Sequence, residues 1–147
     1  DATILAVAGL SRLNLTHRIS ETFLSHVMLP AVAQGAIGLE MRKSDDATRD
    51  LVLPLNDPQT QVCVTLERAF LQKLEGSCRT ALAGLAESTG GTDISFRGQV
   101  LHPKGLRHFE VSHQFRFSDD AVADVRKCGF DAADELKAMA GDSYFNV

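Results

Sequence analysis

The stretch His108-Phe109-Glu110-Val111-Ser112-His113-Gln114-Phe115-Arg116-Phe117 alternates polar side chains with apolar or aromatic ones. Successive side chains of a β-strand point to opposite faces of the sheet, so this alternation predicts a strand with one buried face. That face carries Phe109, Val111, His113, Phe115 and Phe117. Because its neighbours on the face are apolar, we interpret His113 as a partly buried histidine with a hydrogen-bonding partner rather than as a catalytic residue.

Two further strands are predicted immediately upstream of this one. Residues 82–86 form a short apolar run, and a second run alternates apolar or small residues with polar neighbours at Ile94, Phe96, Gly98 and Val100. Gly90-Gly91 between the two runs is typical of a hairpin turn, and residues 102–105 predict the next turn. The three strands are therefore expected to form one antiparallel sheet.

A helix is predicted on each side of these strands. Residues 56–59 combine an N-cap candidate with a proline in the first turn. The apolar face of this first helix carries Val62, Leu66, Ala69, Phe70 and Leu74. A second helix is expected to be capped by Ser118 and to end at Gly141, with an inward face of Val122, Val125, Ala132, Leu136 and Met139. The fold class is thus α+β, with helix, three-stranded antiparallel sheet and helix, and both helices cover the apolar sheet face.

The first 54 residues give a less coherent pattern. Helical spacing is present over residues 1–13 and again over residues 16–24. Residues 35–42 alternate in part and predict a strand, which leads into a helix capped at residues 44–46 and closing near Pro54. We find no closed core in this region, and the chain begins inside a helix-like pattern without methionine, so we expect a piece of a longer protein.

The composition excludes several functional classes. The 147 residues are enough for one ordinary domain, and 15 Lys+Arg against 19 Asp+Glu give a net charge of -4, which argues against a nucleic-acid partner. No apolar run approaches the length of a membrane span, so no membrane partner is expected. The three cysteines form no Cys-x-x-Cys pair, which fits a reducing compartment, and the five histidines lack ligand spacing, so no metal site is expected.

Cys78 is the candidate centre of the chemistry. It lies in Glu75-Gly76-Ser77-Cys78-Arg79-Thr80, directly after the first predicted helix. Gly76 would let the loop turn sharply, and Arg79 would favour the reactive thiolate. The alternative is a buried and inert thiol, as free cysteines commonly are. We interpret Cys63 and Cys128 as packing or incidental thiols.

Four blocks of the sequence resemble, in order and spacing, the porphobilinogen deaminase (hydroxymethylbilane synthase) family. They are residues 1–13, residues 29–38 (LPAVAQGAIG), Glu67-Arg68-Ala69-Phe70 and Glu75–Thr80. The resemblance implies a three-domain enzyme with two α/β domains flanking a cleft and a smaller α+β third domain. Residues 1–34 would end the second domain, residues 35–54 would return to the first, and residues 55–147 would form the third.

The resemblance also implies a chemistry for particular residues. Cys78 would hold a dipyrromethane cofactor by a thioether, assembled from the enzyme's own substrate, and four porphobilinogen units would be added with loss of ammonia. Arg12 would bind a pyrrole carboxylate, since guanidinium is the bidentate partner of that group. Gln34 and Gly35 would line the cleft close to the cofactor. The rival interpretations are a solvated charge for Arg12 and a purely structural turn for Gln34-Gly35.

The resemblance leaves part of the enzyme outside this chain. The family's catalytic aspartate and most substrate-binding arginines belong to the first domain, so the chain alone is expected to be inactive. Its expected partners are porphobilinogen and the missing N-terminal part, and the complete enzyme is expected to be a monomer in the cytoplasm or a plastid. Ala81 follows Thr80 where the family usually has proline, which predicts a less rigid loop.

Two other functional classes remain open on the residues alone. A non-enzymatic α+β interaction module would fold alone and tolerate Cys78→Ser. Thiol redox chemistry at Cys78 is disfavoured, because no resolving cysteine lies near in the sequence.

Overall fold

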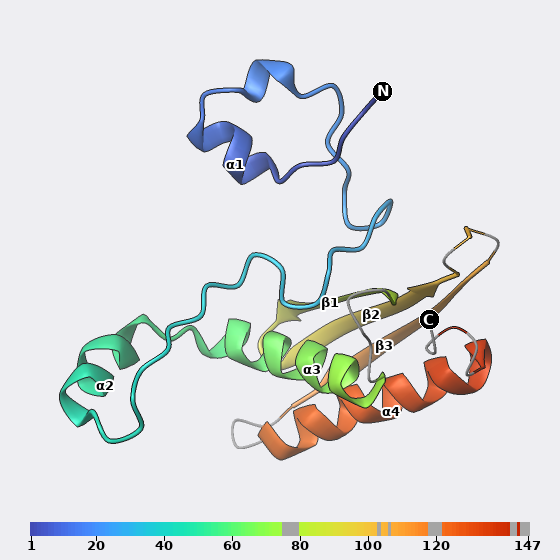
Figure 1. Cartoon of the computed structure of the whole chain (residues 1–147). Helices are drawn as coiled ribbons and strands as arrows, with labels where there is room; N and C mark the ends of the chain where they lie inside the picture. Colours follow the sequence, from blue (N-terminus) through green and yellow to red (C-terminus); the bar gives the residue numbers. More distant parts are fainter. Residues whose placement is uncertain (75–79, 103, 106, 118–121, 142–143, 145–147) are drawn as a thin grey trace.

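The computed structural model describes residues 1–74, 80–102, 104–105, 107–117, 122–141 and 144, with only the backbone of Val122 and Ala123. The C-terminal part is a two-layer unit of two helices on a sheet, and the residues before it extend away as separate lobes around α1 and α2 (Figure 1). The elements are α1 (Val7–Arg12), the 3-10 turn η1 (Thr16–Arg18), α2 (Asp46–Val52), the 3-10 turn η2 (Leu53–Leu55), α3 (Pro58–Leu74), β1 (Ala81–Gly90), β2 (Asp93–Leu101), β3 (His108–Arg116) and α4 (Val122–Ala140).

The three strands form an antiparallel sheet in the order β1-β2-β3, as the sequence predicts. The β1–β2 hairpin turns at Gly90 and Gly91, whose φ angles of 124° and 57° suit glycine. β1 is longer than the predicted stretch and runs from Ala81 to Gly90. The predicted α+β fold class is confirmed.

The core lies between the sheet and the helices α3 and α4, which pack side by side on one sheet face (Figure 1). The Phe70 ring of α3 meets the Phe96 ring of β2 edge to face, with centroids 5.0 Å apart. The fully buried large side chains are Phe70, Phe96, Leu66, Leu74, Leu136, Val100 and Val125. This set confirms most of the predicted inward positions of α3 and β2. Ala69 and Ile94 are buried as well, whereas Val62 is only partly buried.

The ends of the two long helices follow their capping chemistry, with two corrections. Asp57 rather than Asn56 accepts a hydrogen bond from the Thr60 N–H, at 2.7 Å. α4 ends at Ala140, and the N–H of the following Gly141 donates to the Lys137 carbonyl at 2.9 Å, as predicted for the end of this helix. Met139 was expected inside but is 46% exposed, because a spacing of four residues after Leu136 makes Ala140 the residue that packs against the core. The predicted cap Ser118 lies outside the described residues.

The His113 ring is partly buried on the helix-covered face of β3, as predicted. Its Nε2 atom lies 2.9 Å from Glu135 Oε2 of α4. The Nε2 atom has no hydrogen-bond partner among the described residues, so the close contact with Glu135 is not the hydrogen bond that was expected. The ring also stacks on Phe115, with centroids 5.5 Å apart. These contacts agree with the interpretation of His113 as a partly buried residue of the sheet face.

The first 55 residues differ most from the prediction. Residues 35–42 were predicted as a strand but have no regular structure, and the helix expected over residues 16–24 is only the short turn η1. A strand needs a neighbour to satisfy its backbone, and no described strand lies beside residues 35–42. The predicted helix before Pro54 is confirmed as α2, whose cap Asp45 accepts from the Thr48 N–H at 3.0 Å. No described helix is long and apolar enough to cross a bilayer.

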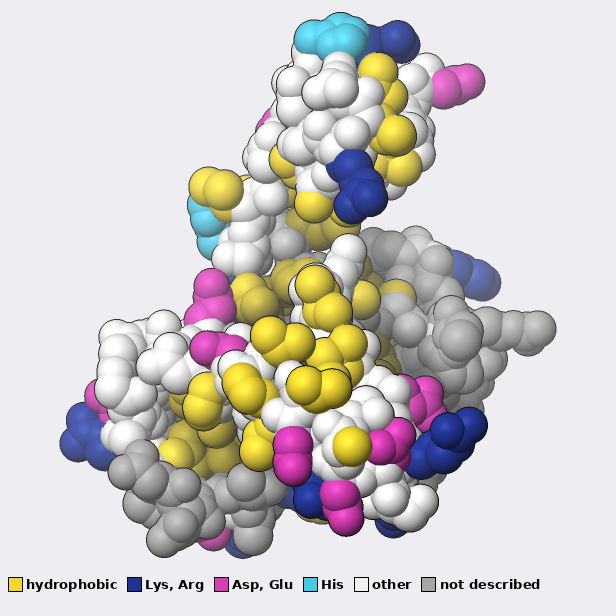
Figure 2. Space-filling view, turned by 90° about the vertical axis from the view of Figure 1, so that its left-hand side faces the viewer, with side chains coloured by type: hydrophobic (Ala, Val, Ile, Leu, Met, Phe, Trp, Pro, Cys, Tyr) yellow, Lys and Arg dark blue, Asp and Glu magenta, His cyan; other side chains and the backbone are white. Residues whose placement is uncertain are grey.

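Large apolar side chains are exposed throughout this N-terminal part. Ile37 is 93% exposed and Leu39 61% exposed, and Leu29 is the one buried residue in the range 1–55. Figure 2 shows hydrophobic side chains gathered on the side of the molecule where α2 lies. Surfaces of this kind mark contact sites for other protein segments.

Candidate functional site

Cys78, the predicted centre of the chemistry, lies outside the described residues, together with Gly76 and Arg79. The residues on each side of this stretch are described. Leu74 ends α3 and is fully buried, and Thr80, directly before β1, is buried as well. The two ends of the stretch that contains Cys78 are therefore anchored in the core.

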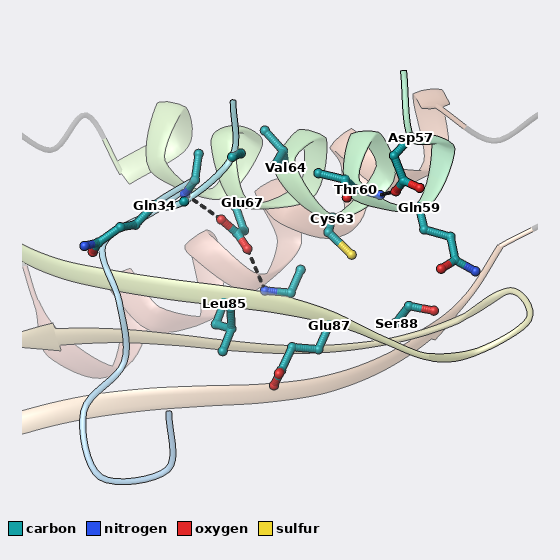
Figure 3. Close-up of a pocket in the computed structure, with 14 residues that line it drawn as sticks. Gln34, Asp57, Gln59, Thr60, Cys63, Val64, Glu67, Leu85, Glu87 and Ser88 are labelled. Atoms are coloured by element: carbon teal, nitrogen blue, oxygen red, sulfur yellow. Dashed lines mark hydrogen bonds between the residues drawn. The ribbon is translucent and has the colours of Figure 1, made fainter. Parts of the chain in front are cut away.

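Gln34 and Gly35 lie together in a tight turn beside α3 and β1. The Gln34 N–H donates to the Ala31 carbonyl at 3.0 Å, and the Gln34 side-chain oxygen accepts from the Ala31 N–H at 3.2 Å. Ala33 and Gly35 both have positive φ angles, of 58° and 88°. The Gln34 side chain is exposed and extends away from the pocket in Figure 3, so its amide nitrogen faces outward from the turn.

Glu67 is a residue of this site that the sequence reasoning missed. It lies on α3 and is only 5% exposed. One carboxylate oxygen, Oε2, accepts from the Ala33 N–H at 2.6 Å, and the other, Oε1, accepts from the Ala86 N–H of β1 at 2.8 Å (Figure 3). Burial raises the pKa of Glu67, and the two N–H donors oppose that rise only in part.

The segment before the turn runs along the outer edge of β1. The Gly84 N–H of β1 donates to the Pro30 carbonyl at 3.1 Å, so the two edge groups of Gly84 and Ala86 both have partners. Arg97 of β2 adds a third link, because its Nη1 donates to the Ser25 carbonyl at 3.2 Å while its Nε donates to Glu110 at 3.0 Å. Residues 25–33 are thus tied to the sheet directly at two points, and at a third through Glu67 of α3.

A pocket of about 410 Å³ lies between this turn, α3 and β1 (Figure 3). Its acidic lining residues are Asp57, Glu67 and Glu87, and neither lysine nor arginine lines its described wall. A row of pyrrole carboxylates would be repelled by these groups, so the pocket itself does not suit such a ligand.

Cys63 also lines the pocket, one helical turn before Glu67. Its thiol is buried, and burial first and the Glu67 charge second raise its pKa, while the Ser88 N–H lowers it only partly. A thiol of this kind is inert. Cys128 lies inside α4 and is half-buried, and burial raises its pKa as well. Both thiols fit the predicted packing role.

A second, more apolar groove of about 550 Å³ lies between residues 36–41, the α2–η2 region and α3. Its apolar lining residues are Ala36, Ile37, Leu39, Met41, Val52, Leu53, Leu55 and Val64. Arg49 and Arg68 lie at the same groove. The groove combines exposed apolar side chains with two cationic groups.

Arg12 lies at the end of α1, in the N-terminal lobe, and is exposed. Among the described residues, no hydrogen bond or ion pair joins it to Gln34 or Gly35. The structure therefore brings together two of the four predicted site residues, which are neighbours in sequence, and leaves Arg12 apart from them. The position of Cys78 relative to the other three stays a prediction.

The fold defines a two-helix, three-stranded α+β domain that follows an irregular segment containing the Gln34-Gly35 turn. Residues 1–50 match the family model described as "Porphobilinogen deaminase, dipyromethane cofactor binding domain", and residues 61–138 match the model of the porphobilinogen deaminase C-terminal domain. The chain belongs to the porphobilinogen deaminase family.

Relatives in a plant and in bacteria agree with this assignment. The chain is 44% identical over 145 residues to the chloroplastic porphobilinogen deaminase of Pisum sativum, covering 99% of this chain and 38% of that protein. It is 40% identical over 147 residues to the porphobilinogen deaminase of Nitrobacter winogradskyi, covering 100% of this chain and 45% of that protein. The chain thus spans less than half the length of these relatives.

Proposed function

We propose that this chain is the C-terminal part of a porphobilinogen deaminase and that Cys78 carries the dipyrromethane primer of the complete enzyme. The observation that supports this most strongly is the match to the family over nearly the whole chain, with both family models present in order. In the sequence, Cys78 lies between Leu74 and Thr80, and both of these residues are buried. The complete enzyme would join four porphobilinogen units to give hydroxymethylbilane.

The chemistry of a thiol fits the attachment of an aminomethylpyrrole. The Cys78 sulfur would form a bond to the pyrrole methylene as the carbon–nitrogen bond breaks, and the amine would leave as ammonia with the thiol proton. A soft thiolate suits the capture of such an electrophilic carbon and gives a stable thioether. When bound, the primer supplies the free pyrrole position at which the next unit is added.

Arg12, Gln34 and Gly35 are proposed to contact the pyrrole chain. All three lie in the range matched by the cofactor-binding model, whereas Cys78 lies in the range of the C-terminal model. Arg12 is exposed and could offer its planar guanidinium to a carboxylate. We also propose the division into residues 1–34, 35–54 and 55–147, supported by the exposed apolar side chains that precede α3.

Activity is proposed to need the upstream part of the enzyme. The relatives are more than twice as long as the matched region, and the family's catalytic aspartate would lie in that upstream part. The chain alone would then be inactive, and the completed enzyme would be a monomer acting on porphobilinogen. The word "chloroplastic" in the name of the pea relative supports a plastid location, and the cytoplasm is the alternative.

Replacement of Cys78 tests this proposal in protein produced together with the upstream half of the pea relative. Cys78→Ala is expected to abolish hydroxymethylbilane formation, because no other side chain replaces the thiol as the anchor. Cys128→Ala is the matched control, since it removes a half-buried thiol from α4 and is expected to keep activity within about twofold. Full activity of Cys78→Ala would contradict the proposal.

A further inference from the structure

We propose that Glu67 is a positioning residue whose carboxylate holds the Gln34-Gly35 turn in a fixed place relative to the two elements that flank Cys78. This inference rests on the proposed function, because it assigns the turn a task in that reaction. It concerns a residue that does not touch the pyrrole chain and acts through the turn.

The two hydrogen bonds of Glu67 join three segments that are far apart in sequence. The carboxylate belongs to α3, which ends four residues before Cys78, and it accepts from the Ala86 N–H of β1, the strand that begins three residues after Cys78. Its other oxygen accepts from the Ala33 N–H, directly before Gln34. One side chain therefore connects the turn with the helix before the cysteine and the strand after it.

A carboxylate is the side chain that can make this connection. Both of its oxygens are acceptors only, whereas the isosteric amide of glutamine would present one NH₂ group to a backbone N–H. Among the described residues no lysine or arginine pairs with Glu67, so the group acts on the backbone and not as half of an ion pair. The bond also restrains Ala33, whose φ of 58° is uncommon for a residue other than glycine.

Burial of a negative charge without a cation opposes folding, which supports a role beyond stability. The pKa of Glu67 is raised because desolvation outweighs the two N–H bonds. Along α3, Glu67 lies seven residues before Leu74, which is about 10 Å of helix. The residue that holds the turn thus lies two helical turns along α3 from Leu74, the last described residue before Cys78.

Amide hydrogen exchange in the 147-residue chain tests the link itself. In Glu67→Gln one of the two amides, Ala33 or Ala86, must lose its acceptor, and its exchange is expected to rise about 10- to 100-fold, as for a lost bond to a charged group. Glu87→Gln is the control, because Glu87 lines the same pocket, is exposed, and makes no bond to the turn. Unchanged exchange at both amides in Glu67→Gln would overturn the inference.

Glu67→Asp provides a second variant that keeps the charge but is too short to reach both amides. It is expected to show the same local rise in exchange, and it replaces Glu67→Gln as the test should the latter fail to fold. Wild-type exchange rates at both Ala33 and Ala86 in Glu67→Asp would show that the length of the side chain does not determine the link between the two amides. That result would contradict the inference.

A kinetic experiment distinguishes a positioning role from a purely structural one, and from a failure of the proposed function. It uses the enzyme completed with the upstream half of the pea relative. Both Glu67 variants are expected to keep the adduct mass on Cys78 while kcat falls roughly 10- to 100-fold, as for a misplaced binding element. A wild-type enzyme without the adduct would contradict the proposed function alone. Wild-type kcat in loaded variants with faster amide exchange would contradict the positioning role alone.

Discussion

At the scale of single residues, the most unusual group in the described chain is the buried carboxylate of Glu67. The side chain is almost fully enclosed, yet both oxygens find backbone N–H donors from segments 34 and 19 residues away. Burial of such a charged group costs free energy, and its hydrogen bonds are strongly directional once its partners are in place. Glu67 therefore specifies an arrangement of segments more than it adds to stability.

The raised pKa of Glu67 predicts a pH dependence with a definite sign. The folded state holds the proton above the ordinary value of 4.5, so the carboxyl's contribution to the free energy of unfolding decreases as pH rises from about 4.5 through the raised pKa. Urea unfolding of the wild type and of Glu67→Gln at several pH values measures this contribution. The contributions of all other carboxyl groups are the same in both proteins and cancel in the difference between their free energies of unfolding. A wild type that gains stability over Glu67→Gln as pH rises through that window would contradict the assignment.

The thiol of Cys63 is predicted to be unreactive in the folded chain. Burial and the nearby Glu67 charge raise its pKa, which lowers the thiolate fraction at neutral pH. Alkylation with iodoacetamide at pH 7.5, followed by peptide mass analysis, is expected to modify Cys63 at least about tenfold more slowly than in urea-unfolded chain. Equal rates in folded and unfolded protein would show that the packing interpretation is wrong.

At the scale of elements, the close approach of α3 and α4 depends on Gly129. A Cβ atom at this position would lie 2.5 Å from the Leu66 carbonyl oxygen and 2.8 Å from the Ala69 Cβ atom. Backbone cannot move aside as a flexible side chain can, so the two helices would have to separate.

Gly129→Ala is therefore predicted to destabilise the chain by about 1–3 kcal/mol, although alanine is a better helix former by up to about 1 kcal/mol. The control is Gly9→Ala in α1, where nothing lies within 4 Å of the added Cβ atom. That variant should be neutral or slightly stabilising in the same urea titration. A stabilising effect of Gly129→Ala would contradict the packing of α3 against α4.

The elements that the sequence predicted are those with signals inside their own residues. The apolar spacing of α3, the glycine pair of the β1–β2 hairpin and the alternation of β3 are local patterns, and each one is present in the structure. The predicted strand at residues 35–42 is absent because its alternation needs a neighbouring strand. Local sequence patterns thus identify those elements whose packing partners also lie in the described part of the chain.

The candidate site was less accessible to sequence reasoning than the fold. Gln34 and Gly35 were found through the family resemblance, and the structure places them in one exposed turn. Glu67 was missed because glutamate beside Arg68 in a helix is usually a solvated charge, and its partners lie on other segments. A buried contact between residues 33 and 67 leaves no periodic signal along the chain.

At the scale of the whole molecule, the chain exposes an apolar surface that is large for a protein of this size. Within the described ranges, the exposed large hydrophobic residues other than Leu101 and Met139 lie between residues 4 and 55. Contiguous patches of this kind are contact surfaces for other segments. The upstream half of the relatives is the natural occupant under the proposed function.

If the upstream half covers this apolar surface, the binding of an apolar dye is predicted to decrease. The 147-residue chain alone should bind the apolar dye ANS strongly, and the same chain produced with the upstream half of the pea relative should bind several-fold less, because residues 4–55 become buried. Equal dye fluorescence per mole in the two preparations would show that the upstream half does not cover this surface.

The central claim, that Cys78 carries a pyrrole primer, is tested most directly by peptide mass spectrometry of the completed enzyme. The peptide that contains Cys78 should carry the added mass of a dipyrrole in active protein, while the Cys63 and Cys128 peptides should be unmodified. An active enzyme whose Cys78 peptide has only the mass of the free thiol would contradict the account.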